Sequence, residues 1–373
     1  YVVRPNEFER ERPYIGHHIA ATLDAFGLQD VTVLNVTPEG EVLPAEIAAN
    51  SDTIRNIRLW DYGPLLRTYK QLQEIRSYYD FTDVDIDRYR FDGQMRQVML
   101  SARELDPAQL QNRTWVNTHL EFTHGYGLVM NPVNEVGPSG LPILFIRDLP
   151  PKVDVPLEIK RPQIYYGEKT STYALVKTDV KEFDYPMGES NARSTYEGKG
   201  GVGIGGAWRR LLFATRSGDT EIFFTGSLKP ESRILYNRNI KDALARLAPF
   251  LLYDADPYLV VMGGRLVWVQ DAYTATDRYP YSRPVAPADP TLSNFQGANY
   301  LRNSVKVTVD AYDGTVVFYA MDDRDPLIMM WRSVFPTLFR PASTMPAELR
   351  EHLRYPEGLF EIQSAVYRTY HMK

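Results

Sequence analysis

Three glycine-containing turns constrain the fold of this 373-residue chain more than any other feature of its sequence. They are Asp92-Gly93, Gly263-Gly264 and Asp313-Gly314, and each lies between two runs of β-forming residues. A turn of this kind closes a β-hairpin, because glycine accepts backbone angles that other residues avoid. The sequence therefore predicts three antiparallel hairpins and excludes an all-helical fold.

Helical patterns separate these hairpins and follow the last one. A helix is predicted from Pro13 to Phe26, with Gly27 as its C-terminal cap, because apolar residues recur on one face. Strands are expected at 30–38 and at Asn56–Trp60. The other predicted helices are 64–75, 207–219, 237–253, 325–336, 345–354 and 356–371, and Ile240, Leu244 and Leu247 share a face in one of them.

Strands and helices mix without strict βαβ alternation, which indicates the α+β class. We expect mixed, mainly antiparallel sheets built from hairpins, with packed helices and a helical C-terminal tail. A turn-rich stretch with many of the 26 prolines divides the chain. The predicted organisation is an α+β subdomain at 1–124, a Pro/Gly-rich linking region with strands at 125–200, and a second α+β subdomain at 201–373, or else one continuous domain.

Composition excludes several classes of function. The net charge of −5 gives no basic field that would attract nucleic acid, so no nucleic-acid partner is predicted. The chain has no cysteine, which excludes disulfides, thiol nucleophiles and thiolate metal sites. No cofactor is predicted apart from the Ca²⁺ considered below. No run of 18 apolar residues is present, so no segment is predicted to span a membrane.

The run Gly201-x-Gly203-x-x-Gly206 before a helical stretch matches a dinucleotide-binding pattern by letter. That pattern needs a hydrophobic strand directly before the first glycine, and the preceding residues are polar and turn-forming. The favoured interpretation is a mobile approach to a helix. The remaining functional alternative is an anion or partner contact formed by Gly201, Gly203, Arg209 and Arg210.

Candidate catalytic groups are a histidine and several carboxylates close to aromatic residues. Paired carboxylates flanked by tyrosine and tryptophan are what a glycosidase uses, although the sequence does not give their separation. No Gly-x-Ser-x-Gly or Ser-x-x-Lys motif is present. The candidates are His124, Glu168, Asp184, Asp254, Asp256 and Asp277.

A candidate metal site lies in the first strand of the first hairpin. Asp83, Asp85 and Asp87 fall on one face if this segment is a strand, and three such carboxylates repel one another unless cations meet them. Arg88, Arg90 and Arg96 could supply that charge internally, and Ca²⁺ is the alternative.

Blocks along nearly the whole chain, from about Asn6 to Gln363, carry a resemblance to a known family. They include DVDIDRYRFDGQMRQVMLSARELD, HLEFTHGYGLVMNPVN, APFLLYDADPYLVV, GRLVWVQDAYTATDRYPYS, NYLRNSVKVTVDAYDGTVVFY and LREHLRYPEGLFEIQ. In these blocks the chain resembles the soluble portion of uncharacterised protein family 0182, which are large bacterial integral-membrane proteins.

The resemblance implies a transmembrane region preceding this segment, and a cell-membrane location with this domain on the extracytoplasmic side. It implies no reaction and no catalytic residues. The leading hypothesis is a non-enzymatic domain whose partners are its own transmembrane region and an envelope polymer or membrane protein. The alternatives are an envelope hydrolase or transferase using paired carboxylates with His124, and a Ca²⁺-stabilised structural domain.

Overall fold

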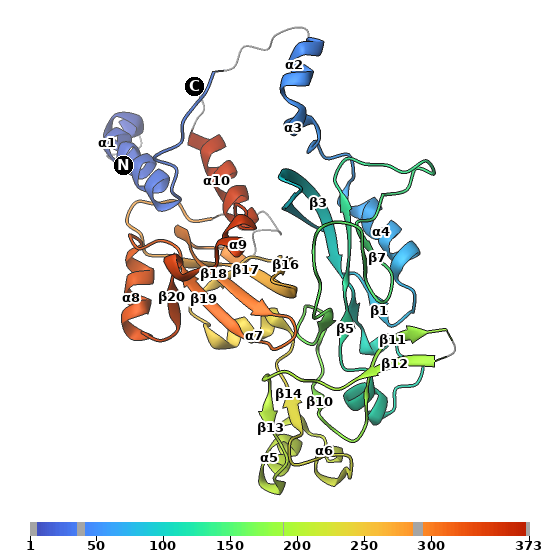
Figure 1. The fold of residues 1–373 in the computed structure, drawn as a ribbon. Coiled ribbons are helices and arrows are strands. Elements are labelled where there is room, and N and C mark those ends of the chain that lie inside the picture. The colour runs from blue at the N-terminus through green and yellow to red at the C-terminus, as the bar shows by residue number, and fades with distance from the viewer. Residues whose placement is uncertain (1–5, 36–41, 189, 286–293, 371–373) are drawn as a thin grey trace.

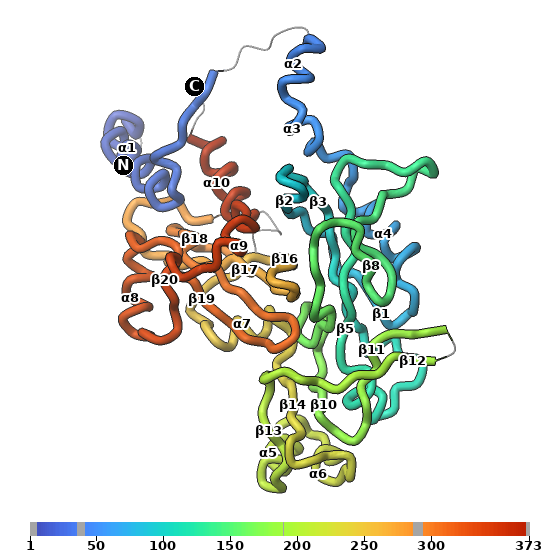
Figure 2. The backbone as a smooth tube through the Cα atoms, viewed as in Figure 1, coloured from blue at the N-terminus to red at the C-terminus, as the bar shows by residue number. Residues whose placement is uncertain are grey.

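The fold was analysed in a computed structural model, which describes residues 6–35, 42–188, 190–285 and 294–370. Two antiparallel-rich sheets lie beside each other, and a smaller lobe lies at one end of the pair (Figure 1). The continuous trace in Figure 2 shows the chain passing from the N-terminal helices into the five-stranded sheet, then the small lobe, and last the six-stranded sheet. The α+β class predicted from the sequence is confirmed.

The six-stranded sheet contains two of the predicted hairpins. Its order is β15 (Leu252–Tyr253), β17 (Arg265–Thr276), β18 (Tyr300–Asp310), β19 (Val316–Ala320) and β20 (Phe339–Pro341), and β16 (Tyr258–Met262) also pairs with β17. The β16–β17 hairpin turns at Gly263-Gly264, and β18–β19 turns around Asp313-Gly314, as predicted. All pairings are antiparallel except β19 with β20.

The five-stranded sheet contains the first hairpin. Its order is β2 (Asp85–Phe91), β3 (Gln94–Ala102), β6 (Leu128–Pro132), β7 (Ile146–Arg147) and β8 (Lys152–Val153), all antiparallel. Phe91 pairs with Gln94, so Asp92-Gly93 is the whole turn. The φ angles of Asp92 and Gly93 are 50° and 80°, which is the geometry that an Asp-Gly hairpin turn adopts.

Short strands connect these sheets to the small lobe. The two-stranded pairs are β1 (Tyr79–Asp80) with β4 (Glu104–Leu105), β5 (Gly125–Tyr126) with β9 (Gln163–Ile164), and β11 (Glu182–Met187) with β12 (Ser190–Ser194). The small lobe is the sheet β10 (Ala174–Val176), β14 (Arg233–Leu235) and β13 (Val202–Gly203), with helices α5 (Ala207–Ser217) and α6 (Glu221–Phe224) against it (Figure 1).

The described residues form eight further helices. They are α1 (Glu7–Ala25), α2 (Pro44–Ala49), α3 (Ser51–Ile54), α4 (Tyr62–Gln73), α7 (Ile240–Leu247), α8 (Pro326–Val334), α9 (Ala347–Glu351) and α10 (Glu357–Tyr370). Single turns of 3-10 helix at Pro107–Gln109 and Ala342–Thr344 and a π-helical turn at Asn117–Glu121 complete the elements described. The predicted helical tail is therefore present as α8, α9 and α10.

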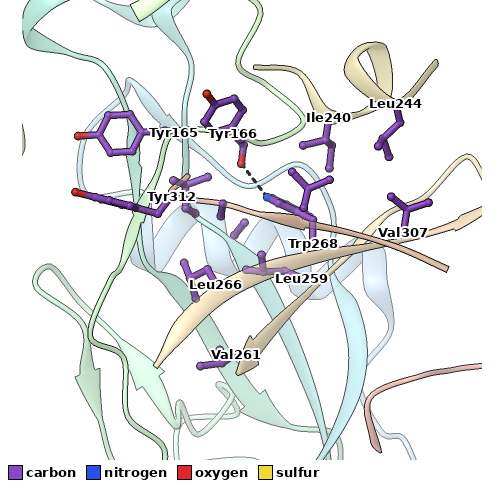
Figure 3. Close-up of a cluster of buried hydrophobic side chains, with 14 of the residues drawn as sticks. Tyr165, Tyr166, Ile240, Leu244, Leu259, Val261, Leu266, Trp268, Val307 and Tyr312 are labelled. Atoms are coloured by element: carbon purple, nitrogen blue, oxygen red, sulfur yellow. Dashed lines mark hydrogen bonds between the residues drawn. The ribbon is translucent and has the colours of Figure 1, made fainter. Parts of the chain in front are cut away.

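One hydrophobic core joins the three segments that the sequence suggested as separate units. Its buried members include Val98 of β3, Tyr165 and Tyr166 after β9, and Trp268 of β17. Figure 3 shows Trp268 donating its indole N–H to the carbonyl of Tyr166, at 2.9 Å. The indole N–H of this large buried side chain thus has a hydrogen-bond partner, which comes from the segment 125–200.

Four local predictions differ from the structure. Residues 30–35 form no strand, and the rest of that predicted strand lies outside the described residues. Asn56–Trp60 is also not a strand, and the first helix begins at Glu7, so that Pro13 lies inside it. The helix predicted at 237–253 is shorter: α7 ends at Leu247, which is 53% exposed while Ile240 and Leu244 are buried, and residues 252–253 form strand β15.

Candidate metal centre

Three carboxylates from distant parts of the chain converge on one point. Asp83 lies between β1 and β2, Glu168 lies between β9 and β10, and Asp256 lies between β15 and β16. One oxygen from each lies within 4.8 Å of the others. Oxygen ligands of Ca²⁺ lie about 2.3–2.6 Å from the ion, so one ion can contact all three.

Glu168 is held in place by its backbone. Glu104 accepts hydrogen bonds from the amides of Glu168 and Lys169, at 3.1 and 3.0 Å. On the other side, the amide of Ile240 donates to the carbonyl of Gly167, at 3.0 Å, and the side chain of Asn239 donates to the carbonyl of Glu168. The Glu168 backbone is therefore fixed before any ligand binds.

The carboxylate of Glu168 is buried and only partly satisfied. Its side chain is 4% exposed, and Lys241 Nζ lies 2.7 Å from Oε2 as an ion pair. The other oxygen, Oε1, has no hydrogen-bond partner among the described residues. A buried carboxylate oxygen without a partner is costly, and a ligand that supplies positive charge at this point removes that cost.

Asp83 and Asp256 connect the cluster to solvent. Both line a cavity of about 380 Å³, together with Tyr62, Arg354 and other residues. The Asp256 side chain is 38% exposed, and its Oδ2 lies 3.7 Å from the Arg354 guanidinium. The cluster thus has a buried end at Glu168 and an open end at Asp83 and Asp256.

The electrostatics of the cluster favour a bound proton or cation. Burial, reinforced by the charge of Glu168, raises the pKa of Asp83 to about 6. Burial and the charge of Asp83 raise the pKa of Asp256 to about 7. Burial also raises the pKa of Glu168, although Lys241 opposes the shift. Like charges this close disfavour full ionisation unless a cation compensates them.

Asp85 and Asp87 do not join Asp83, which differs from the predicted metal set. Both are buried on β2 and are already satisfied. Asp85 accepts from the amide of Leu259, at 3.1 Å, and from Arg354, at 3.2 Å, so it satisfies an outward N–H on the edge strand β16. Asp87 Oδ2 lies 2.8 Å from Nδ1 of His352.

The partners of these two carboxylates therefore come from the far end of the chain: the guanidinium of Arg354 for Asp85 and the ring of His352 for Asp87. Arg354 and His352 follow α9, whereas the sequence had suggested Arg88, Arg90 and Arg96. Arg96 instead pairs with Glu135.

His124 is a buried structural histidine in this fold. Its side chain has no exposed area. Nε2 lies 2.9 Å from Oδ1 of Asp184, and Nδ1 lies 2.9 Å from Oγ1 of Thr123. Because Thr123 donates its only hydroxyl hydrogen to Glu182, at 2.7 Å, Nδ1 of His124 must donate to Thr123.

Both ring nitrogens of His124 are then donors, as in an imidazolium. Burial disfavours that charge, but hydrogen bonds and charges from Asp184 and Glu182 outweigh it and raise the pKa of His124. With both nitrogens engaged and the ring enclosed, His124 cannot contact a substrate in this conformation.

The two remaining catalytic candidates lie elsewhere. Asp254 accepts from the hydroxyl of Tyr273, at 2.5 Å, and from the amide of Gly358 in the first turn of α10, at 3.1 Å. It therefore caps that helix electrostatically. Asp277 is 75% exposed on its side chain, and its Oδ1 lies 3.7 Å from Nε of its neighbour Arg278.

The glycine run is packed against its neighbours at Gly201 and Gly205, which differs from the predicted mobile approach. Gly201 has φ of 70°, and a Cβ there would lie 2.3 Å from the carbonyl oxygen of Ile234 on β14. A Cβ on Gly205 would lie 2.2 Å from the carbonyl oxygen of Pro230. Glycine is thus required because two backbones approach closely.

The two arginines proposed for an anion contact are directed toward carbonyl oxygens. Arg209 donates to Gly203, at 3.1 Å, and Arg210 donates to Ile204 and Leu228, at 3.1 and 3.2 Å. These bonds engage one nitrogen of Arg209 and two of Arg210.

Sequence reasoning placed every member of the carboxylate cluster among its candidates but divided them between two sites. Asp83 was assigned to a metal site, and Glu168 and Asp256 to catalysis. A shared site was not predictable from spacing, because the three residues meet only after three separate segments have packed together.

Comparison with known proteins gives a family and no reaction. The model of the uncharacterised protein family UPF0182 matches residues 1–373. A UPF0182 protein of Pelotomaculum thermopropionicum is 49% identical over the whole chain, and one of Trichodesmium erythraeum is 47% identical. The chain spans 40% and 42% of these two relatives. No solved structure matches it.

Within the described residues, every helix is too short or too polar to cross a bilayer. The family match over the full length and the high identity to several of its members agree with one another. The chain belongs to the uncharacterised protein family UPF0182.

Proposed function

We propose that this chain is a Ca²⁺-binding domain that acts outside the cytoplasmic membrane and binds a component of the bacterial envelope. The observation that carries the proposal is the carboxylate of Glu168, 4% exposed, with Oε1 unpartnered beside Asp83 and Asp256. Three carboxylates on separate segments form a donor set of hard oxygen ligands, which suits Ca²⁺ or Mg²⁺ and not a softer metal.

Ca²⁺ fits this cluster better than Mg²⁺. Mg²⁺ requires near-octahedral geometry at about 2.0–2.1 Å and keeps most of its water, whereas Ca²⁺ accepts irregular sets of 6–8 oxygens. The three carboxylates come from loops of different elements, which gives an irregular set. Solvent in the adjoining cavity could supply the remaining ligands.

The bound ion would have a structural and a binding role. It would join the segments before β2, before β10 and before β16, which belong to different parts of the fold. Its open side would face the cavity of about 380 Å³, where Arg354 offers a guanidinium to an anionic or hydroxyl-rich envelope component. Such a ligand would complete the coordination of the ion, so binding would depend on Ca²⁺.

The direct test is calorimetric titration of chelator-treated protein with CaCl₂ and, separately, MgCl₂. We expect saturable Ca²⁺ binding with a dissociation constant of about 10⁻⁴–10⁻³ M, as in extracellular modules, and weaker Mg²⁺ binding. Glu168→Gln should weaken Ca²⁺ binding at least tenfold. Asp277→Asn removes an exposed carboxylate outside the cluster and should leave binding unchanged.

Two results would reject the metal proposal. One is the absence of Ca²⁺ binding by a protein whose circular dichroism shows it folded. The other is an equal effect of Glu168→Gln and Asp277→Asn, since that would mean a diffuse interaction with surface charge.

The extracytoplasmic location can be tested separately. The chain has no cysteine, so a single Asp277→Cys change gives one exposed thiol. In the full-length protein, stripped of other cysteines, a membrane-impermeant maleimide should label this thiol in intact cells. Labelling that appears only after the cells are lysed would place the domain inside.

A further inference from the structure

A second concave site lies between the small lobe and the six-stranded sheet. It is a groove of about 520 Å³, and its apolar floor includes Val202 of β13, Val309 of β18 and Val316 of β19. Tyr166 and Ile240, both labelled in Figure 3, form part of its wall. Its volume is within the range of sites that hold small organic ligands.

The polar groups of this groove are cationic. Arg216 at the end of α5 and Arg246 on α7 both line it, and no aspartate or glutamate of the described chain lines it. Neither arginine forms an ion pair with a carboxylate in the described ranges, although the chain as a whole has a net charge of −5. Two guanidinium groups without acidic partners beside one groove favour an anion.

Aromatic and amide contacts hold the two arginines toward the groove. The Arg216 guanidinium lies over the ring of Tyr236, 5.5 Å from its centroid. Arg246 donates to Oδ1 of Asn237, at 2.9 Å. The backbone of Asn237 has φ of 50°, in the left-handed region that asparagine adopts more readily than most residues. Tyr236 and Asn237 also line the groove.

The glycine run supplies one edge of the same site. Gly201 lines the groove, and Arg233 donates to the carbonyls of Gly200 and Gly201, at 2.6 and 2.7 Å. Gly314, on the hairpin opposite, has no room for a side chain, because a Cβ there would lie 2.4 Å from the Tyr166 ring. These contacts hold Gly201 in place, which the sequence analysis had given as part of a possible anion contact.

An acidic group close to the lining residue Tyr166, Asp313, is already paired with a cation. The charge of Asp313 acts on Tyr166, but its Oδ2 lies 2.9 Å from Arg265, and its Oδ1 accepts from the amide of Lys199, at 2.9 Å. It therefore leaves Arg216 and Arg246 available to a ligand.

We propose that this groove binds a small ligand in which a phosphate or carboxylate is joined to a ring. Arg216 and Arg246 would hold the anionic group, and Tyr236, Tyr166 and the valine floor would contact the ring. The site shares no lining residue with the carboxylate cluster or its cavity, so the inference does not depend on Ca²⁺ binding.

The test is calorimetric titration in EGTA with phenyl phosphate, glucose 1-phosphate and inorganic phosphate. We expect at least one of the two ring-bearing probes to bind saturably and more tightly than inorganic phosphate, and the stronger of the two identifies an aryl or a sugar ring. Arg216→Gln and Arg246→Gln should each weaken that binding about tenfold, because each removes a charge-assisted hydrogen bond. Arg209→Gln, an exposed arginine on the same helix, is the matched control.

Three results would overturn the proposal. They are no saturable binding of either ring-bearing probe, inorganic phosphate binding as tightly as both, and an Arg209→Gln effect equal to that of Arg216→Gln. Thermal unfolding of each variant establishes that it is folded, and chemical-shift changes at Tyr236 give a second measure of where the probe binds. Shifts confined to residues outside the groove would also overturn it.

Discussion

Gly167 and Glu104 are in such close contact that a Cβ on the glycine would lie 2.0 Å from Oε2 of the glutamate. This approach lets Glu104 accept from the next two amides along the chain, those of Glu168 and Lys169. The position of the buried Glu168 carboxylate thus depends on a residue that has no side chain.

Gly167→Ala should therefore weaken Ca²⁺ binding without removing any ligand. The added methyl group must displace Glu104, which shifts the Glu168 turn, and we expect a loss of stability of about 2 kcal/mol or more. Urea unfolding and Ca²⁺ titration measure the two effects. Gly226→Ala is the control, since a Cβ there meets nothing within 4 Å. Unchanged Ca²⁺ affinity in a folded Gly167→Ala variant would contradict the predicted coupling.

The carboxylate cluster predicts a pH dependence of stability in the absence of metal. The pKa values of Asp83 and Asp256 in the folded protein, about 6 and about 7, lie above the value of about 3.9 in an unfolded chain. The folded state therefore holds these protons more tightly. The stabilisation that these protonated carboxyl groups give the folded protein is complete below about pH 4 and is lost as the pH rises through 6 to 7.

Asp256→Asn should reduce this dependence. The variant should gain stability over the parent protein at pH 8 compared with pH 5. Because the Asp256 side chain is 38% exposed, solvent screening limits this difference in the free energy of unfolding to about 1 kcal/mol. Urea unfolding in EGTA at both pH values measures it, and Asp277→Asn should leave the dependence unchanged. Added Ca²⁺ should stabilise the parent protein more at pH 8 than at pH 5, because at pH 5 protons compete for the carboxylates.

His124→Gln should destabilise the protein by about 3–5 kcal/mol, because it leaves Asp184 and Glu182 without their buried cation. The folded pKa of His124 is raised, so its stabilisation is complete below about pH 6.5 and declines as the pH rises through the folded value. The difference between parent and variant should thus be larger at pH 6 than at pH 9 in urea unfolding.

His119 provides a contrast for that measurement. Burial lowers its pKa, and its ring stacks on Tyr173 at 3.9 Å, so the neutral form is favoured in the folded state. Its contribution to stability should fall as the pH decreases, which is the opposite direction. If His119→Gln and His124→Gln gave the same pH profile, the assigned charge states would be wrong.

Gly201→Ala and Gly206→Ala should differ sharply in stability. At Gly201 the backbone has φ of 70° and a Cβ would meet Ile234, so we expect a loss of more than about 2 kcal/mol. At Gly206 nothing lies within 4 Å, and the cost should stay below about 1 kcal/mol. Thermal unfolding compares the two, and equal losses would show that the glycine run is not packed.

Features set by neighbouring residues were predictable from the sequence. The Asp92-Gly93 turn needs only two positive φ values and flanking strands, and it formed as expected. The alternation in 30–38 was equally clear, but residues 30–35 have no strand to pair with in the described structure, and Val31 and Val33 are 44% and 54% exposed. Alternation of apolar and polar residues indicates that a segment can form a strand, but it does not show whether another strand is present to pair with it.

The candidate sites were predictable only as sets of residues. Asp85 finds its cation at Arg354, and Asp83 meets Glu168 and Asp256, because packing between distant segments decides these contacts. The spacing of residues in a single sequence does not show which distant segments pack together. The groove lined by Arg216 and Arg246 was missed for the same reason, although one of its edges, Gly201, had been singled out.

The separation of Asp83, Glu168 and Asp256 along the chain also bears on the order of folding. A loop closes at an entropic cost that grows with its length, and contacts between distant residues form late on the folding path. The three carboxylates can meet only after the β2–β3 hairpin, the Glu168 turn and the β16–β17 hairpin have docked. Occupancy of this cluster would therefore report that these three distant segments have assembled, and not the folding of any one of them.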